Sequence, residues 1–135
     1  MKVAFFLPSL RGGGAERVML NLAKGLLDKG IKVDIVLCRA EGEYLSKTPK
    51  EIRVIDLNAK RTLTSMPRLI QYLNREKPNT LISALGHANL VAIWANKLSK
   101  SNTQVIVTEH STMSQVIIDG NKVSMFLLTL FKKIF

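Results

Sequence analysis

Three consecutive glycines, Gly12, Gly13 and Gly14, separate an apolar run from a segment with helical periodicity. This order predicts a strand, a tight turn and the N-terminus of a helix. The first amides of a helix have no acceptor within the helix, the helix dipole is positive at that end, and glycine lets a ligand approach the backbone. The pattern therefore predicts binding of a phosphate group. The alternative is that the glycines only form a tight loop.

The glycine run departs from two stricter phosphate-binding motifs. In the dinucleotide-binding motif Gly-x-Gly-x-x-Gly, the third glycine would stand where this chain has Arg17. The P-loop requires Lys followed by Ser or Thr after the turn, and that pair is missing here. Cys38 and Arg39 stand where an acidic residue would bind a ribose at the end of the second strand. A dinucleotide-binding domain of an oxidoreductase is therefore only an alternative interpretation.

Polar side chains follow two later apolar runs of the sequence. His87 follows one of them, and Glu109, His110 and Ser111 follow the other. A histidine at the end of a strand can donate a hydrogen bond to a sugar hydroxyl or carbonyl, or it can bond to the backbone as a cap or in the core. Ser111 could instead cap a helix, and His87 could simply begin one. Glu109 is expected to be structural rather than a catalytic base.

Apolar runs alternate with amphipathic segments along the chain. In the segment 87–99, Leu90, Val91, Trp94 and Leu98 are predicted to form the buried face of a helix. Repeated strand-helix-strand units with apolar strands predict an α/β fold, a Rossmann-like doubly wound parallel sheet. Ligands of such sheets bind beyond the carboxyl ends of the strands, where the candidate residues stand. The predicted strands are residues 3–7, 31–38, 51–57, 80–85 and 104–108, and the predicted helices are residues 15–29, 63–75 and 87–99.

The composition indicates one compact domain with anionic partners. The chain has 135 residues, of which 47% are hydrophobic, and a formal net charge of +10. This charge favours nucleotides, nucleic acids, acidic glycans or anionic lipids as partners. The single cysteine, Cys38, has no partner for an internal disulfide, which favours an intracellular location, and no apolar run is long enough to predict a membrane-spanning helix. Only 6% of the residues are aromatic and no recognition motif is present, which disfavours a nucleic-acid binder.

Two basic segments could meet a membrane surface. Residues 122–135 predict an amphipathic helix with lysines opposite a wide apolar face. Such a helix either packs against its own sheet or binds an anionic membrane surface. Lys60, Arg61 and Arg68 form a second basic cluster beside the predicted helix 63–75. A cluster of this kind is most often a solvated face.

Three motifs, in this order, resemble the N-terminal half of a retaining family-four glycosyltransferase. They are Gly-Gly-Ala-Glu-Arg-Val-Met-Leu-Asn-Leu-Ala at residues 13–23, Lys-Pro-Asn at 77–79 and Val-Ile-Val-Thr-Glu-His-Ser at 105–111. The resemblance spans nearly the whole chain. It implies the GT-B architecture, in which two Rossmann-like domains face each other across a cleft. Residues 1–135 would be the N-terminal, acceptor-side domain, incomplete at its C-terminal end, and the domain that binds the nucleotide sugar would lie outside this chain.

The resemblance also implies an activity and a site. A sugar would pass from a nucleotide-sugar donor to a glycan or lipid-linked acceptor, without a cofactor or metal ion, and the chain alone would be inactive. The glycines would lie near the donor diphosphate or an acceptor phosphate, and His110 would lie near the transferred sugar as the catalytic residue. Glu109, Ser111 and His87 are the further expected ligand contacts. A cytoplasmic location, with attachment to the inner face of the membrane as a hypothesis, and no nucleic-acid partner complete this interpretation.

Overall fold

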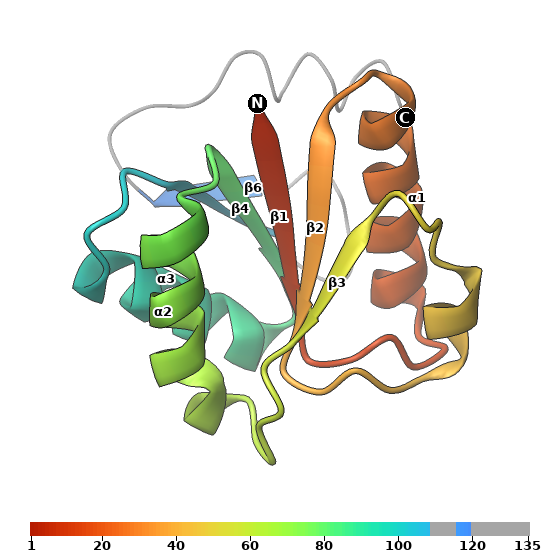
Figure 1. The fold of residues 1–135 in the computed structure, drawn as a ribbon. Helices are drawn as coiled ribbons and strands as arrows, with labels where there is room; N and C mark the ends of the chain where they lie inside the picture. Colours follow the sequence, from red (N-terminus) through yellow and green to blue (C-terminus); the bar gives the residue numbers. More distant parts are fainter. Residues whose placement is uncertain (109–115, 120–135) are drawn as a thin grey trace.

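The computed structural model describes residues 1–108 and 116–119, and within them six strands form one sheet (Figure 1). The strand order is β3-β2-β1-β4-β5-β6. β6 runs antiparallel to β5, and the other four pairings are parallel. The strands are β1 (Lys2–Leu7), β2 (Lys32–Leu37), β3 (Arg53–Asp56), β4 (Thr80–Ala84), β5 (Gln104–Thr108) and β6 (Val116–Asp119). The helices are α1 (Gly14–Asp28), α2 (Met66–Glu76) and α3 (Gly86–Leu98), with short 3-10 helices at Glu43–Lys47 and Leu63–Ser65.

The central strand β1 is buried from Val3 to Leu7 and pairs with β2 on one side and β4 on the other. Side chains alternate between the two faces of a strand, so a strand covered on both faces is apolar throughout. Phe5 belongs to the core on the α1 side, and Phe6 belongs to the core beneath α2 and α3. Figure 1 shows α1 on one face of the sheet and the other two helices on the opposite face. The predicted α/β fold with a doubly wound parallel sheet is therefore confirmed.

The helix ends follow local sequence signals. Gly30, just after α1, has a φ of +81°, a conformation that glycine adopts without strain. α2 ends at Glu76, its C-cap residue Lys77 is left-handed with φ +46°, and Pro78 follows. The predicted helix 63–75 is divided into a 3-10 turn and α2. The remaining predicted strands and helices lie within a few residues of the observed ones.

The predicted buried face of α3 is wrong. Leu90, Trp94 and Leu98 are 48%, 51% and 62% exposed, and of the predicted stripe only Val91 is buried. The buried positions are Ala88, Val91, Ala92 and Ala95. Alanines let a helix approach a sheet and a neighbouring helix closely, so the small face packs and the large side chains point outward. The prediction favoured large apolar side chains and therefore assigned the wrong face of α3 to the core.

The antiparallel strand β6 was not predicted. It has four residues and pairs with β5 in the register Ile106 to Ile118. The strand-helix alternation of the rest of the chain predicts parallel strands joined by helices, and it does not predict an antiparallel strand that follows β5 without a helix between them. The helix predicted at residues 122–135 lies outside the described residues.

Candidate functional site

The order of the strands reverses between β1 and β4, which places a topological switch point at their carboxyl ends. In open parallel sheets ligands bind in the crevice at such a point. β1 leads into the glycine loop, Gly12, Gly13 and Gly14, and β4 leads into Gly86 and the exposed His87 at the start of α3. Phe6 and Ser83 are register partners near the ends of these strands, so both loops leave the same edge of the sheet.

Three predicted site residues cannot be placed. Glu109, His110 and Ser111 follow β5 and lie outside the described residues. β5 itself is parallel to β4 and ends at Thr108, on the edge where the glycine loop begins. The predicted roles of these three residues therefore stay predictions.

The glycine loop is shaped by two carboxylates. The amide of Gly13 donates a hydrogen bond to Glu16 Oε2 at 3.0 Å, and Glu16 lies in the first turn of α1, where a negative charge suits the helix dipole. A side-chain carbon on Gly13 would crowd Glu16, and one on Gly12 would overlap the carboxylate of Glu43. Gly14 has open space around it. The same helix terminus that was predicted to bind a phosphate is thus capped by Glu16 in this structure.

Further amides of this helix terminus remain available. Among the described residues, the N–H groups of Gly14 and Ala15 have no hydrogen-bond acceptor. Unpaired amides at a helix N-terminus attract anions, and of these two residues Gly14 is exposed whereas Ala15 is buried. A phosphate that reached them would meet the carboxylate of Glu16 beside it, so the anion would have to compete with that side chain.

Gly42, in the loop after β2, supports the glycine loop, and the sequence pattern did not predict this role. Its φ is +119°, and a side-chain carbon there would overlap the backbone of Leu10 and Arg11. Leu10 donates its N–H to Glu41 O at 2.9 Å and accepts the N–H of Tyr44 at 3.0 Å. The segment after β2 therefore fixes the start of the glycine loop. Only the contact in space reveals this, since nothing in the sequence near Gly42 marks it.

Leu85, between β4 and α3, is in a strained conformation. Its φ is +78° with ψ +135°, a region that residues with a side chain rarely adopt. Such strain is often found at binding sites, where surrounding contacts hold the backbone in place. The amide of Asn89 donates to Leu85 O at 2.9 Å, and Asn89 Nδ2 donates to Thr108 O at 3.1 Å. Leu85 thus directs Gly86 and His87 at the switch point.

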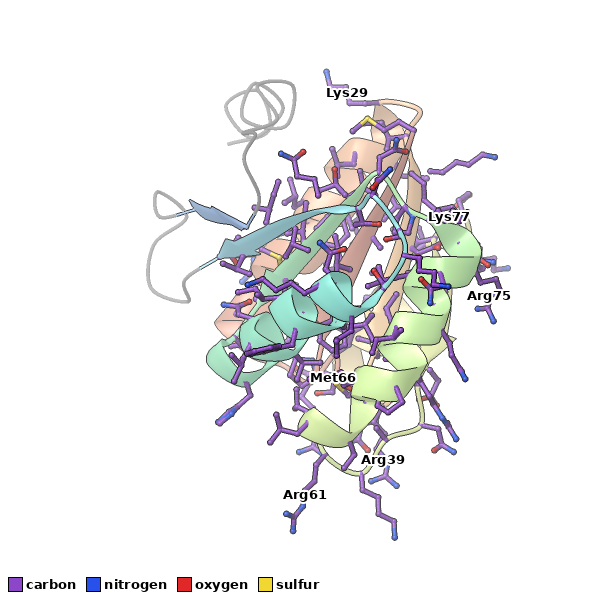
Figure 2. The ribbon with its side chains drawn as sticks, turned by 90° about the vertical axis from the view of Figure 1, so that its left-hand side faces the viewer. Lys29, Arg39, Arg61, Met66, Arg75 and Lys77 are labelled. Atoms are coloured by element: carbon purple, nitrogen blue, oxygen red, sulfur yellow. The ribbon has the colours of Figure 1, made fainter. Side chains whose placement is uncertain are left out.

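A basic pocket of about 250 Å³ lies at the carboxyl ends of β1, β2 and β3. Its polar lining comes from three loops, and Figure 2 shows two of its members, Arg39 and Arg61, together at one end of the molecule, opposite Lys29. The glycines that contact Glu16 and Glu43 are not part of its lining. We call this hollow the basic pocket and define it by Ser9, Arg11, Arg39, Glu41, Lys60 and Arg61.

The loop that carries Lys60 and Arg61 is held by hydrogen bonds. Asn58 has a φ of +49° and donates its N–H to Asp56 Oδ1, which turns the chain after β3. Ala59 N–H donates to Cys38 O at 2.8 Å, and Arg68 Nη1 on α2 donates to Leu57 O at 2.7 Å. Arg68 of the predicted basic cluster is thus a structural residue, whereas the exposed residues Lys60 and Arg61 line the pocket.

Cys38 lies just beneath this edge. It is buried, and its Sγ lies 3.4 Å from Ser65 Oγ. Burial raises the pKa of the thiol, although hydrogen bonding with Ser65 and Thr62 opposes that effect. A buried thiol that is harder to ionise is a poorer nucleophile, so we assign Cys38 no role in the site.

A second charged cluster lies at the opposite, amino edge of the sheet. Asp34, only 4% exposed, accepts hydrogen bonds from Tyr72 Oη at 2.6 Å and Arg53 Nη2 at 2.9 Å. Glu76 accepts from Lys2 Nζ at 2.8 Å and from Arg53 Nη2 at 2.6 Å, and these bonds lower the pKa of Glu76 from its usual 4.5 to about 2. A hollow of about 430 Å³ borders this cluster, but the opposite charges of the cluster already form ion pairs with one another. We therefore assign the cluster a structural role.

The described residues contain no group of three or more His, Cys, Asp and Glu side chains that could hold a metal ion. Within the same part of the chain, every helix is too short or too polar to cross a bilayer.

Comparison with known proteins identifies relatives over most of the chain. Residues 12–134 match the model of the family described as Glycosyltransferase Family 4. A curated Campylobacter jejuni protein is 31% identical over 121 residues, covering 82% of this chain and 33% of the relative. It is named GalNAc-α-(1→4)-GalNAc-α-(1→3)-diNAcBac-PP-undecaprenol α-1,4-N-acetyl-D-galactosaminyltransferase. The chain thus spans about a third of the length of this relative.

Two solved structures share the fold at low sequence identity. The apo form of the lipopolysaccharide outer core galactosyltransferase WaaB superimposes with a TM-score of 0.63 and 20% identity, over 82% of this chain and 33% of that one. A Mycobacterium tuberculosis structure described as glycinamide-RNase-transformylase T superimposes with a TM-score of 0.52 and 17% sequence identity, over 78% of this chain and 28% of that one. Neither an oxidoreductase nor a nucleic-acid binder is favoured by these relatives.

Proposed function

The chain belongs to glycosyltransferase family 4, and on this premise we propose that it is the acceptor-binding N-terminal domain of a GT-B enzyme that transfers a sugar from a nucleotide sugar. We propose a hexosyltransferase that retains the anomeric configuration and needs no metal ion. The observation that carries the proposal is the family match over residues 12–134, which begins in the glycine loop at the switch point.

The acceptor we propose is a glycan joined to a lipid through a diphosphate. The name of the Campylobacter jejuni relative describes such an acceptor, a glycan linked through PP to undecaprenol. A net charge of +10 suits an acceptor that carries phosphates and a membrane surface that is anionic. Peripheral attachment at the cytoplasmic face of the membrane belongs to the same proposal, because the lipid part of such an acceptor lies in a membrane.

The chemistry assigns roles to the predicted residues. When the nucleoside diphosphate leaves, negative charge develops on its phosphate oxygens, and fixed N–H dipoles stabilise that charge without having to reorient. The free amides of Gly14 and Ala15 support such a role for the glycine loop. We propose that His110 donates a hydrogen bond to the transferred sugar, with Glu109 and Ser111 beside it. His87, at the edge where the glycine loop begins, is proposed to contact the acceptor.

The complete reaction requires both sides of a cleft. Positioning and charge stabilisation come from groups on each side of the reacting atoms, and this chain spans about a third of the length of its relative. We therefore propose that a donor-binding domain takes part in catalysis. The 135 residues alone are expected to bind acceptor and to transfer no sugar. Normal sugar transfer by this chain alone would contradict that expectation.

A binding comparison tests the proposed function. The chain is titrated at physiological salt with a fluorescent polyprenyl diphosphate glycan in detergent, with the fluorescent lipid-free glycan as control, with NADH, and with mixed oligonucleotides. We expect saturable binding of the glycolipid only. Tight NADH binding would instead support a dinucleotide-binding domain, and oligonucleotide binding at this salt concentration would support a nucleic-acid binder.

A further inference from the structure

The basic pocket has a strong excess of positive charge. Arg11 and Arg39 both form ion pairs with the single carboxylate of the pocket, that of Glu41. None of the ion pairs between described residues involves Lys60 or Arg61. The lining of the pocket therefore contains four cationic residues and one carboxylate. Like charges held together on facing loops repel one another, and an anionic ligand relieves that repulsion.

The positions from which the cations extend are fixed by the fold. Arg11 follows β1, Arg39 follows β2, and Lys60 and Arg61 follow β3, three strands that are hydrogen-bonded neighbours in the order β3-β2-β1. Arg39 N–H donates to Pro8 O at 3.1 Å, which ties the first two loops together. The hydrogen bonds of Ala59 and Arg68 hold the third loop. A ligand would therefore need to order only the side chains, which lowers the entropic cost of binding.

The size and chemistry of the pocket define its ligand. Guanidinium groups bind phosphate oxygens through paired hydrogen bonds, and an ammonium group adds a point charge. Ser9 adds a hydroxyl, a further potential donor. A hollow of about 250 Å³ holds a small anion but not a whole nucleotide sugar or a duplex groove. We propose that the basic pocket binds a phosphate or diphosphate group, as an anion site separate from the glycine loop.

The separation from the glycine loop follows from the arrangement of charges. Glu16 and Glu43 lie against Gly13 and Gly12, whereas the cations of the pocket belong to Arg11, just before these glycines, and to the loops after β2 and β3. An anion approaching this edge is repelled by the first pair and attracted by the second group. If the proposed function holds, the natural ligand is the diphosphate of the lipid-linked acceptor; binding of the anion itself does not depend on that function.

Calorimetric titration with inorganic pyrophosphate tests the site in the full 135-residue chain. The double variant Lys60→Glu/Arg61→Glu reverses the two unpaired cations, and its matched control, Lys29→Glu/Lys50→Glu, makes the same charge change at two exposed lysines that do not line the pocket. We expect the first variant to bind at least about tenfold more weakly and the control to stay within about twofold of the parent chain at physiological salt. All four substituted positions are exposed, so circular dichroism should show an unchanged fold.

Three calorimetric results would overturn the proposal. They are no detectable pyrophosphate binding by the parent chain, unchanged binding by Lys60→Glu/Arg61→Glu, and an equal loss in both double variants, since an equal loss would report only net charge. The variant Glu41→Gln gives an independent check, because removal of the single competing carboxylate should tighten pyrophosphate binding by about threefold. Weaker binding by Glu41→Gln would also count against the site.

A vesicle experiment distinguishes the two sources of the anion. The chain is sedimented with phosphatidylcholine vesicles that contain a polyprenyl diphosphate, with plain phosphatidylcholine vesicles as control. If the diphosphate vesicles retain the chain, and both added pyrophosphate and the variant Lys60→Glu/Arg61→Glu abolish this retention, the site binds a lipid diphosphate. Pyrophosphate binding without vesicle retention supports the anion site and assigns it to a soluble diphosphate. The diphosphate vesicles could also retain the chain equally well in the presence of pyrophosphate and with Lys60→Glu/Arg61→Glu. That result would refute the pocket as the lipid diphosphate site.

The same data separate this proposal from the proposed function. If the chain binds pyrophosphate through Lys60 and Arg61 but does not bind the glycolipid, the anion site is supported and the acceptor-binding function is refuted. If Lys60→Glu/Arg61→Glu binds the glycolipid as well as the parent chain does, the acceptor-binding function is supported and this pocket is refuted as the diphosphate site.

Discussion

Gly42 lies so close to Leu10 that a side-chain carbon on Gly42 would overlap the Leu10 carbonyl. Leu10 also donates to Glu41 and accepts from Tyr44, so this contact joins the glycine loop to the segment after β2. The site at the carboxyl edge therefore depends on a glycine outside the glycine loop.

The variant Gly42→Ala should destabilise the protein by about 2 to 4 kcal/mol, because φ +119° disfavours a side chain and the new carbon meets rigid backbone. Gly14→Ala is the matched control, with open space around the new carbon and an expected change within about 0.5 kcal/mol. Urea unfolding measures both. Equal stability of the two variants would contradict the contact described for Gly42.

The strain at Leu85 can be measured by comparing two truncations. Leu85→Ala removes the side chain beyond the β-carbon and Leu85→Gly removes the β-carbon too, but only glycine adopts φ +78° with ψ +135° freely. Leu85→Gly should therefore be more stable than Leu85→Ala by about 1 to 2 kcal/mol. At an unstrained position alanine is normally the more stable of the two. That normal order, found in chemical denaturation, would mean that Leu85 carries no strain.

Stability should fall in acid because of Glu76. Its pKa is lowered from 4.5 to about 2 in the folded chain, so the stabilisation is fully present above pH 4.5 and is lost as the pH falls toward 2. Glu76→Gln should lower stability at neutral pH and flatten the decline between these values. Urea midpoints measured across this pH range test the prediction. Glu51→Gln, which removes an exposed carboxylate without an ion pair among the described residues, is the control and should keep the stability of the parent chain at neutral pH within about 0.5 kcal/mol.

The corrected orientation of α3 predicts a contrast between neighbouring residues. Val91→Ala should cost about 2 kcal/mol, because the residue is fully buried between α3 and the sheet. Leu90→Ala should change the free energy of unfolding by no more than about 0.5 kcal/mol, because Leu90 is 48% exposed. Thermal and urea unfolding give the comparison. If Leu90→Ala lowered the free energy of unfolding more than Val91→Ala does, the buried face predicted from the sequence would be correct after all.

The fold was predictable wherever one signal dominated. Buried strands such as β1 appear as unbroken apolar runs, and α1 has a clear stripe through Met19, Leu22 and Leu26. α3 failed because its packing depends on small residues, which hydrophobic periodicity weights less than Leu90 or Trp94. β6 was missed because it follows β5 directly and runs antiparallel to it, outside the strand-helix alternation of the other elements.

The candidate site was predictable only in its position. The alternation of strands and helices indicates that loops such as Gly12–Gly14 meet at the carboxyl edge, and they do. The basic pocket was missed because its cations come from three loops that are distant in sequence, and Lys60 and Arg61 alone resemble a solvated face. The capping of Gly13 by Glu16 likewise depends on side-chain geometry. The roles of Glu109, His110 and Ser111 stay predictions.

The outward orientation of Trp94 gives the protein an intrinsic optical reporter. It is the only tryptophan in the chain, its ring is half in water, and Lys97 Nζ lies 5.8 Å from the ring centroid. Indole emission moves to shorter wavelength when water leaves the ring. A second domain or a lipid surface that covers this side of α3 would therefore be visible without a label, whereas a small anion at the carboxyl edge of β1, β2 and β3 would leave the spectrum unchanged.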